Sequence, residues 1–103
     1  SDASFAKHAE ATVKIYLEAL VRGDQTTALA QLGAPSGSPD AQLSEQQFID
    51  PSTRIAWITS KPAPGGATVD VDLIAKKGEY FVTFHLARGP LGPIIREHNF
   101  IKP

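Results

Sequence analysis

The sequence predicts an α+β fold, in which an N-terminal long helix and shorter helices pack on a curved four-stranded antiparallel sheet. Three observations predict it. The segment 11–32 is the longest stretch with helical periodicity, the apolar period changes from about 3.6 to 2 after Pro51, and four strand-length runs follow. We therefore expect one domain over residues 1–103, with a helical part over 3–50 and a sheet over 53–102.

The first helix is predicted from a stripe of apolar residues spaced three and four apart, which lie on one face of a helix. Asp2 or Ser4 is expected to cap its N-terminus. The opposite face is charged and is expected to be solvated, with ion pairs Glu10–Lys14 and Glu18–Arg22. The apolar stripe consists of Phe5, Ala9, Val13, Tyr16, Leu17, Leu20 and Val21.

Helix boundaries are predicted from glycine, proline and capping residues. Gly23 ends the first helix, and Asp24 caps a second one over 25–32 that Gly33 closes. The proline-rich segment 34–40 predicts a loop. Ser44-Glu-Gln-Gln47 has the pattern of a capping box, which predicts a short helix ending before Pro51.

The sheet is predicted as a meander of strands over 54–60, 68–76, 80–87 and 94–101. A two-residue turn at Lys77-Gly78 would place Ala75 opposite Tyr80 and would give the central hairpin one wholly apolar face. The other face would be mixed, with Asp70 opposite His85. It supplies the candidate interface residues Ile74, Phe81, Thr83 and His85.

The last strand has no clean amphipathic pattern, because each of its two faces is apolar at the ends and polar in the middle. Buried polar groups need partners, so two alternatives remain at this point. Either this strand lies at the sheet edge, or its inward polar pair lines a wet cavity.

Composition excludes several function classes. Ten basic and eleven acidic residues without a run of either sign give no reason to expect nucleic acid or contact of this fragment with a membrane. The absence of cysteine excludes thiol chemistry, and His8, His85 and His98 lie on different elements without metal-ligand spacing. We expect no metal and no cofactor. Since the chain lacks methionine and begins at Ser1, we expect a processed or excised form.

The helix pattern Tyr16-Leu-Glu-Ala-Leu, followed by Gly23-Asp24, a second helix and a sheet, resembles the NTF2-like superfamily of cystatin-like α+β folds. Tyr16 precedes Asp24 by eight residues, the spacing of the oxyanion-hole tyrosine in ketosteroid isomerases. The chain departs from those enzymes at 34–40, where their general base would be, and its apolar hairpin face carries no second acid. The resemblance is closer to small extracytoplasmic domains of bacterial envelope proteins, and it implies a location there, behind a tether.

Two function hypotheses follow, and the missing acid favours the first. One is a non-catalytic interaction or sensing domain that binds a protein partner or self-associates, as a dimer, through the mixed sheet face. The alternative is a binder of a small apolar ligand, or a residual enzyme, with a cavity under the long helix. The candidate pocket residues are Tyr16, Phe48, Trp57, Arg96 and His98.

Overall fold

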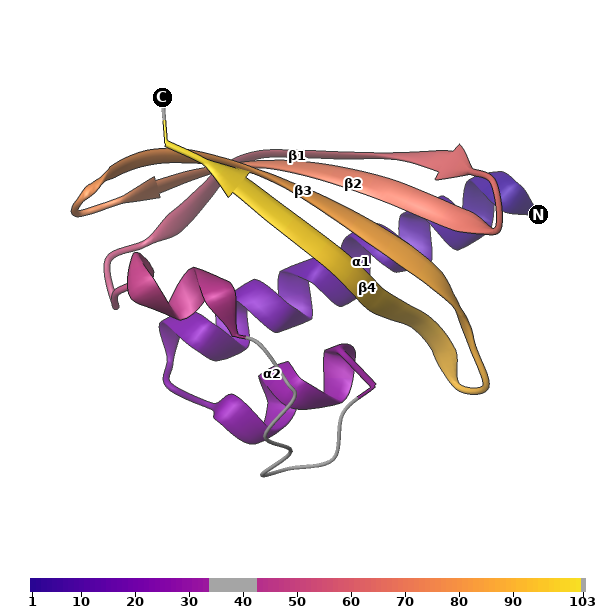
Figure 1. Cartoon of the computed structure of the whole chain (residues 1–103), viewed down its shortest axis with the longest axis horizontal. Helices are drawn as coiled ribbons and strands as arrows, with labels where there is room; N and C mark the ends of the chain where they lie inside the picture. The colour runs from indigo at the N-terminus through magenta and orange to yellow at the C-terminus, as the bar shows by residue number, and fades with distance from the viewer. Residues whose placement is uncertain (34–42, 103) are drawn as a thin grey trace.

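The computed structural model describes residues 1–33 and 43–102. It is an α+β structure in which the helices cover one face of a single antiparallel sheet (Figure 1). The predicted loop at 34–40 lies outside the described residues. The elements are α1 (Asp2–Val21), α2 (Gln25–Gln31), the 3₁₀ helix η1 (Ser44–Gln47), β1 (Arg54–Ala63), β2 (Gly66–Ala75), β3 (Gly78–Gly89) and β4 (Gly92–Ile101).

The N-cap of α1 lies before both predicted caps. Ser1 is the N-cap, its hydroxyl accepts from the Ser4 backbone N–H at 3.1 Å, and the Ser4 hydroxyl completes a capping box. The predicted caps Asp2 and Ser4 are therefore wrong, because Ser1 satisfies the first free N–H groups. The predicted apolar stripe is confirmed, and it is buried from Phe5 to Leu20.

The two ion pairs expected along α1 do not form. Glu10 instead lies 3.5 Å from Lys7 and accepts a hydrogen bond of 2.8 Å from the Ser60 hydroxyl of β1. That hydrogen bond lowers the pKa of Glu10, and Lys7 and Lys14 add to the effect. Arg22 pairs with Asp24 rather than Glu18, at 3.1 Å. Glu18 therefore has no ion-pair partner among residues 1–33 and 43–102.

The corner between α1 and α2 forms as predicted. Gly23 takes the left-handed conformation with φ of 77°, which glycine adopts without steric cost. Asp24 then caps α2, since its carboxylate accepts from the Thr27 backbone N–H at 3.1 Å. A second hydrogen bond, from the Thr27 hydroxyl, and this backbone bond together lower the pKa of Asp24.

The capping box predicted at Ser44 is wrong. Ser44 is the first residue of η1 rather than its cap, and the N-cap Leu43 makes no side-chain capping bond. The Ser44 hydroxyl points instead to Glu45 and to His98 of β4. The contact with His98, which lies far away in the sequence, thus replaces the local capping bond that the pattern at Ser44 predicts.

The sheet has the predicted meander order β1-β2-β3-β4, but the central hairpin is shifted by two residues. The turn is Lys76-Lys77, so that Ala75 pairs with Gly78 and Leu73 with Tyr80. A primed turn at Lys77-Gly78 would need positive φ at Lys77, whereas Gly78 alone takes it, at 144°. Because side chains alternate with a period of two, the shift leaves every side chain on its predicted face.

The outer-face pairs differ accordingly. Asp70 lies opposite Thr83 rather than His85, and it accepts a hydrogen bond of 2.9 Å from the Thr83 hydroxyl. The predicted Asp70–His85 pair is therefore wrong.

Both edge strands carry a β-bulge, and the bulge in β4 settles the ambiguity of this strand. The register shifts between His85 and Leu86, so that Ile95 faces inward before the bulge and His98 and Phe100 face inward after it. Two apolar side chains and a single polar one thus face inward. β4 is an edge strand, as one of the two alternatives expected. β1 has its own shift between Ile55 and Trp57.

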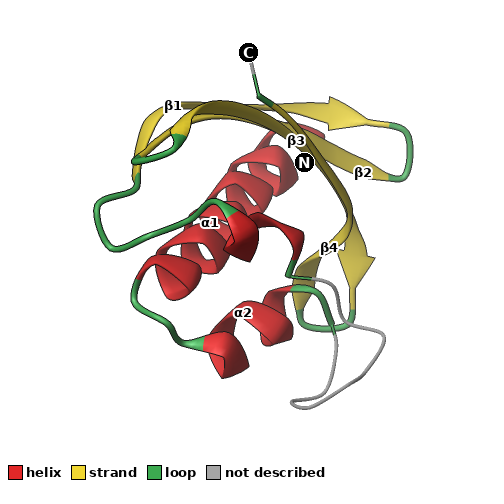
Figure 2. Ribbon diagram, turned by 60° about the vertical axis from the view of Figure 1, so that its left-hand side comes forward, coloured by secondary structure: helices red, strands yellow, loops and turns green. Residues whose placement is uncertain are grey.

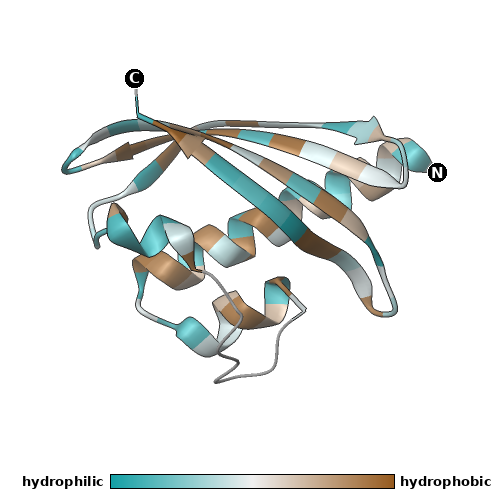
Figure 3. Ribbon diagram, in the orientation of Figure 1, coloured by the Kyte–Doolittle hydropathy of each residue, from teal (hydrophilic) through white to brown (hydrophobic). Residues whose placement is uncertain are grey.

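The core lies between α1 and the inner face of the sheet, which arches over the helix (Figure 2). Apolar and polar bands alternate along the strands, as a sheet covered on one face requires (Figure 3). Val69, Val71, Leu73, Val82 and Phe84 form the sheet side of the core, each at most 1% exposed. This confirms the predicted apolar face of the hairpin.

Gly66 offers a test of the packing between β2 and β3. A Cβ atom at this position would lie 1.8 Å from the Leu86 carbonyl oxygen. We predict that Gly66→Ala lowers the free energy of unfolding by about 1–3 kcal/mol, because backbone must move to make room. Urea unfolding measures this change.

Gly65→Asn is the matched control in the same turn. Gly65 has φ of 75°, a Cβ atom there would have no neighbour within 4 Å, and asparagine tolerates this conformation. Its cost is expected to be smaller than that of Gly66→Ala. Equal costs for the two variants would contradict the steric argument.

Candidate functional site

The most distinctive polar group of the inner face is a buried carboxylate. Glu45 of η1 is 0% exposed, and its carboxylate accepts a hydrogen bond from the Tyr16 hydroxyl of α1. Nδ1 of His98 on β4 lies 2.8 and 2.7 Å from its two oxygens. The Ser44 hydroxyl lies 3.1 Å from Oε2. Three separate elements thus meet at one carboxylate.

Aromatic rings surround this network. Tyr16 meets Phe84 edge-on with ring centroids 5.9 Å apart, and Phe84 stacks on His98 at 6.0 Å with an interplanar angle of 6°. A second cluster lies beside it, in which Phe48 stacks on Tyr80 at 3.8 Å and meets Phe100 at 4.8 Å. The hydrogen bonds therefore sit in surroundings that contain little water, where they are strong and costly to break.

The geometry of the network does not activate a nucleophile. Since a carboxylate only accepts hydrogen bonds, Nδ1 of His98 carries the proton that it shares with Glu45. Ser44 approaches the same nitrogen, at 3.2 Å, and so meets a donor rather than a base. In a catalytic triad the hydroxyl and the acid bind opposite nitrogens of the imidazole.

The Tyr16 hydroxyl is also engaged in a hydrogen bond within the protein. It donates to Glu45, and its pKa is raised because burial disfavours the phenolate and the Glu45 carboxylate repels it. Tyr16 therefore stays protonated and points at an acid rather than into a substrate site. The hairpin face carries no acid, as expected, but η1 places the buried acid Glu45 next to Tyr16, which was not predicted from the sequence.

The five candidate pocket residues do not gather around one cavity. Tyr16 and His98 meet at Glu45, at a ring-centroid distance of 5.8 Å, and Phe48 lies in the neighbouring aromatic cluster. Trp57 is 53% exposed on the outer face, and Arg96 is the exposed extra residue of the β4 bulge.

The outer face of the sheet collects exposed apolar side chains. Trp57 pairs with Asp72, Asp72 with Phe81, and Phe81 with Ile101, so these four residues form one row across all four strands. Trp57, Phe81 and Ile101 are 53%, 46% and 69% exposed. We call these four residues the outer row. Thr83 and His85 follow Phe81 along β3 on the same face, whereas Ile74 of β2 lies on the other side of the outer row, opposite Glu79.

Two carboxyl groups lie on this face next to each other. Asp72 lies in the outer row, and one of its oxygens, Oδ1, is buried without a hydrogen-bond partner among the described residues. Hydrogen bonding to Asp72 and repulsion by its charge, together with some desolvation, raise the pKa of Glu79. Glu79 therefore takes up a proton at a higher pH than an isolated glutamate does, and this removes one negative charge from the outer face.

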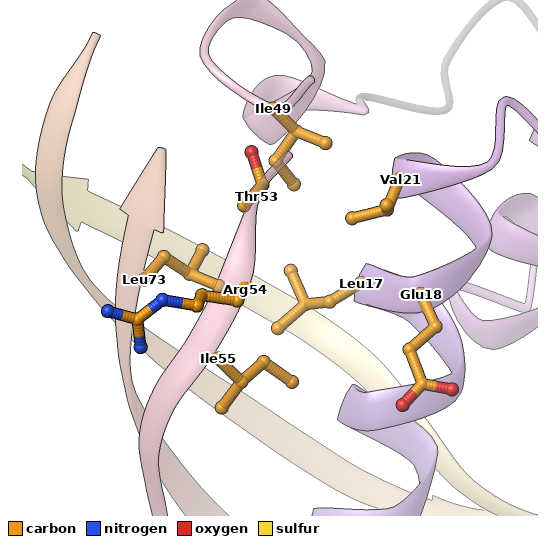
Figure 4. Close-up of a pocket in the computed structure, with 8 residues that line it drawn as sticks. All are labelled: Leu17, Glu18, Val21, Ile49, Thr53, Arg54, Ile55 and Leu73. Carbon is orange, nitrogen blue, oxygen red and sulfur yellow. The ribbon is translucent and has the colours of Figure 1, made fainter. Parts of the chain in front are cut away.

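A separate pocket of about 350 Å³ lies between the end of α1 and the start of β1 (Figure 4). Its walls are largely aliphatic, and charged residues stand only at its edge. None of the five candidate pocket residues lines it. The lining residues are Leu17, Glu18, Val21, Ile49, Thr53, Arg54, Ile55 and Leu73.

Comparison of the chain with protein-family models, curated proteins and solved structures gave no match. Within residues 1–33 and 43–102, no three or more histidine or acidic side chains are grouped so that they could hold a metal ion. The helices of this part of the chain are all too short or too polar to cross a membrane.

The buried network predicts a large stability effect at Glu45. Glu45→Ala should lower the free energy of unfolding by about 2–4 kcal/mol, because it leaves the Tyr16 hydroxyl and the His98 ring without partners in the core. Chemical denaturation measures the loss. The control is Gln46→Ala at the exposed neighbouring position, expected to stay within about 0.5 kcal/mol of the parent. A similar small change in both variants would show that the network contributes little.

The raised pKa of Tyr16 predicts a component of alkaline instability. Below pH about 10 the Tyr16 phenol is neutral in both the folded and the unfolded state. Above this pH the phenol ionises in the unfolded chain but stays protonated in the folded state. The free energy of unfolding should then fall by up to about 1.4 kcal/mol per pH unit from this residue. Tyr16→Phe should lack this component, as urea unfolding at pH 8 and pH 11 would show. Lysine ionisation is common to both proteins, so equal pH slopes would contradict the assignment.

Proposed function

We propose that this chain is a non-catalytic NTF2-like domain that works as an interaction module, and that it pairs with a second copy through the outer face of the sheet. The observation that carries the proposal is the outer row, in which Trp57 on one side of Asp72, and Phe81 and Ile101 on the other, are exposed to water. Exposed apolar groups gathered in this way are typical of protein interfaces.

The inner face supports a non-catalytic role. Tyr16, the residue that most resembles a catalytic group, donates its hydroxyl to a buried acid. His98 shares its Nδ1 proton with the same acid. Both side chains serve the packing of α1, η1 and β4.

The edges of the sheet are poorly suited to strand pairing. Each edge strand carries a β-bulge and a proline, Pro62 in β1 and Pro93 in β4. These are devices that protect edge strands from adding further strands. The face of the sheet is therefore a better association surface than its edges.

The residues of the outer face also complement each other across a two-fold axis. An axis parallel to the strands, between β2 and β3, would lay β1 of one copy over β4 of the other. Trp57 would then meet Ile101 of the second copy in the outer row. Lys61 would meet Glu97, since Lys61, Thr68, His85 and Glu97 form a second cross-strand row. The apolar ends of the outer row thus meet each other and Lys61 meets an opposite charge, while Asp72 lies opposite Phe81 of the second copy, and each contact occurs twice, as in an isologous interface.

The test is the oligomeric state of two matched variants. Phe81 and Ile15 are 46% and 45% exposed, but Ile15 lies on α1, away from the sheet face. We predict that the parent chain is a dimer and that Phe81→Asp weakens association by at least about 30-fold, the loss of one hot-spot residue. Ile15→Asp should leave the dimer intact. Sedimentation equilibrium measures both.

Charge reversal checks the two-fold arrangement. Lys61→Glu and Glu97→Lys should each weaken the dimer, and the double variant should recover part of the loss. A parent chain that stays monomeric, or a Phe81→Asp variant that stays dimeric, would overturn the interface. The location in a bacterial cell envelope, which the resemblance implies, stays a prediction.

The alternative function is binding of a small apolar ligand under the long helix, and the residues predicted for it are not the ones that line the pocket between α1 and β1. The residues predicted for it are used in packing or face outward. The pocket beside α1 supports a ligand site in another place.

A further inference from the structure

We propose that the pocket between α1 and β1 binds a small apolar molecule that carries a protonated amine. This site lies on the inner side of β1, so it is independent of the proposed dimer face.

Most of the wall surface is apolar and comes from aliphatic side chains. Leu17 and Val21 enter from α1, Ile55 from β1 and Ile49 from the segment before β1 (Figure 4). Leu73, paired with Ile55 across the strands, is 1% exposed. The β1 bulge directly follows Ile55 and separates its inward orientation from the outward one of Trp57.

The polar wall residue adds little polarity. The hydroxyl oxygen of Thr53 accepts a hydrogen bond of 2.9 Å from the Asp50 backbone N–H. This hydroxyl already accepts one hydrogen bond within the protein, and Thr53 itself is only 7% exposed. The pocket therefore favours an apolar occupant over water.

The size limits the ligand. An apolar cavity of roughly 150 Å³ takes up benzene. The pocket of about 350 Å³ is large enough for a molecule of two fused rings or a short branched chain. It falls at the lower end of the range for small-molecule sites.

The charges at the edge select a cation. Glu18 stands at the edge of the pocket on α1, without an ion-pair partner among residues 1–33 and 43–102. The C-terminal end of α1, where the helix dipole is negative, lies on the same side, and the cation that follows it, the C-cap Arg22, is paired with Asp24. The guanidinium of Arg54 is turned away from α1, to the other side of β1 (Figure 4). A positive group next to the apolar body would therefore be stabilised.

Three probes that share one apolar body test the proposal. They are 2-naphthylmethylamine, 2-naphthylmethanol and 2-naphthoate, titrated into the ¹³C-methyl-labelled protein and followed by NMR. We expect shifts in the methyl signals of Leu17, Val21 and Ile55, with the amine bound about fivefold to tenfold more tightly than the carboxylate. Glu18→Gln should reduce that ratio to about twofold while binding of the alcohol is unchanged.

Filling the pocket provides the second test. Val21 is half-buried at the open side, and Val21→Trp should abolish binding of all three probes while thermal unfolding shows an intact fold. If that variant unfolds, Ile49→Trp fills the pocket from the opposite wall. The proposal is overturned if none of the probes shifts the pocket methyl groups at millimolar concentration, or if the filled variants still bind. Equal binding of amine and carboxylate to the parent chain would overturn its cationic part.

Discussion

A carboxylate that has no contact with water must find its hydrogen bonds inside the protein, and Glu45 finds them on three elements. Tyr16 comes from α1, His98 from β4 and Ser44 from η1 itself. A buried charge of this kind adds little net stability compared with apolar packing, but loss of one partner is expensive. The network therefore specifies where η1 sits against the helix and the sheet more than it strengthens the fold.

That placement depends on the edge strand β4. Without its bulge, the strand would present either Ile95 or His98 to the interior, because residues three apart lie on opposite faces of a regular strand. The bulge at residue 96 brings both inward. Ile95 then completes the apolar core beside Leu86, and His98 reaches Glu45. The β4 bulge thus allows the same strand to contribute to both the apolar core and the polar network. It also protects the edge of the sheet from pairing with a further strand.

The accuracy of the sequence predictions follows the range of the interactions involved. The stripe on α1, the Gly23-Asp24 corner and the faces of β2 and β3 depend on periodicity and local backbone geometry, and all are predictable. The predicted hairpin register is two residues off, yet its faces are right, because a shift of two preserves alternation. The local pattern at Ser44 predicts a cap instead of the network, since a local rule cannot detect His98 arriving from a strand 53 residues beyond Glu45. Trp57 faces outward because of the bulge after Ile55, and the sequence of β1 contains no residue that predicts this bulge.

The Tyr16–Asp24 spacing, which resembles that of ketosteroid isomerases, and the chemistry of the inner face point to different roles for Tyr16. A tyrosine that serves as an oxyanion donor must keep its hydroxyl free for the substrate. In this chain the hydroxyl of Tyr16 is held by an acid whose other bonds are also filled, so the inner face is closed by its own hydrogen bonds. Since both edges are irregular, the proposed association would use the exposed apolar residues of the outer row. The pocket at the end of α1 is separated from that surface by the thickness of the sheet, which allows a ligand and a partner to be bound at the same time.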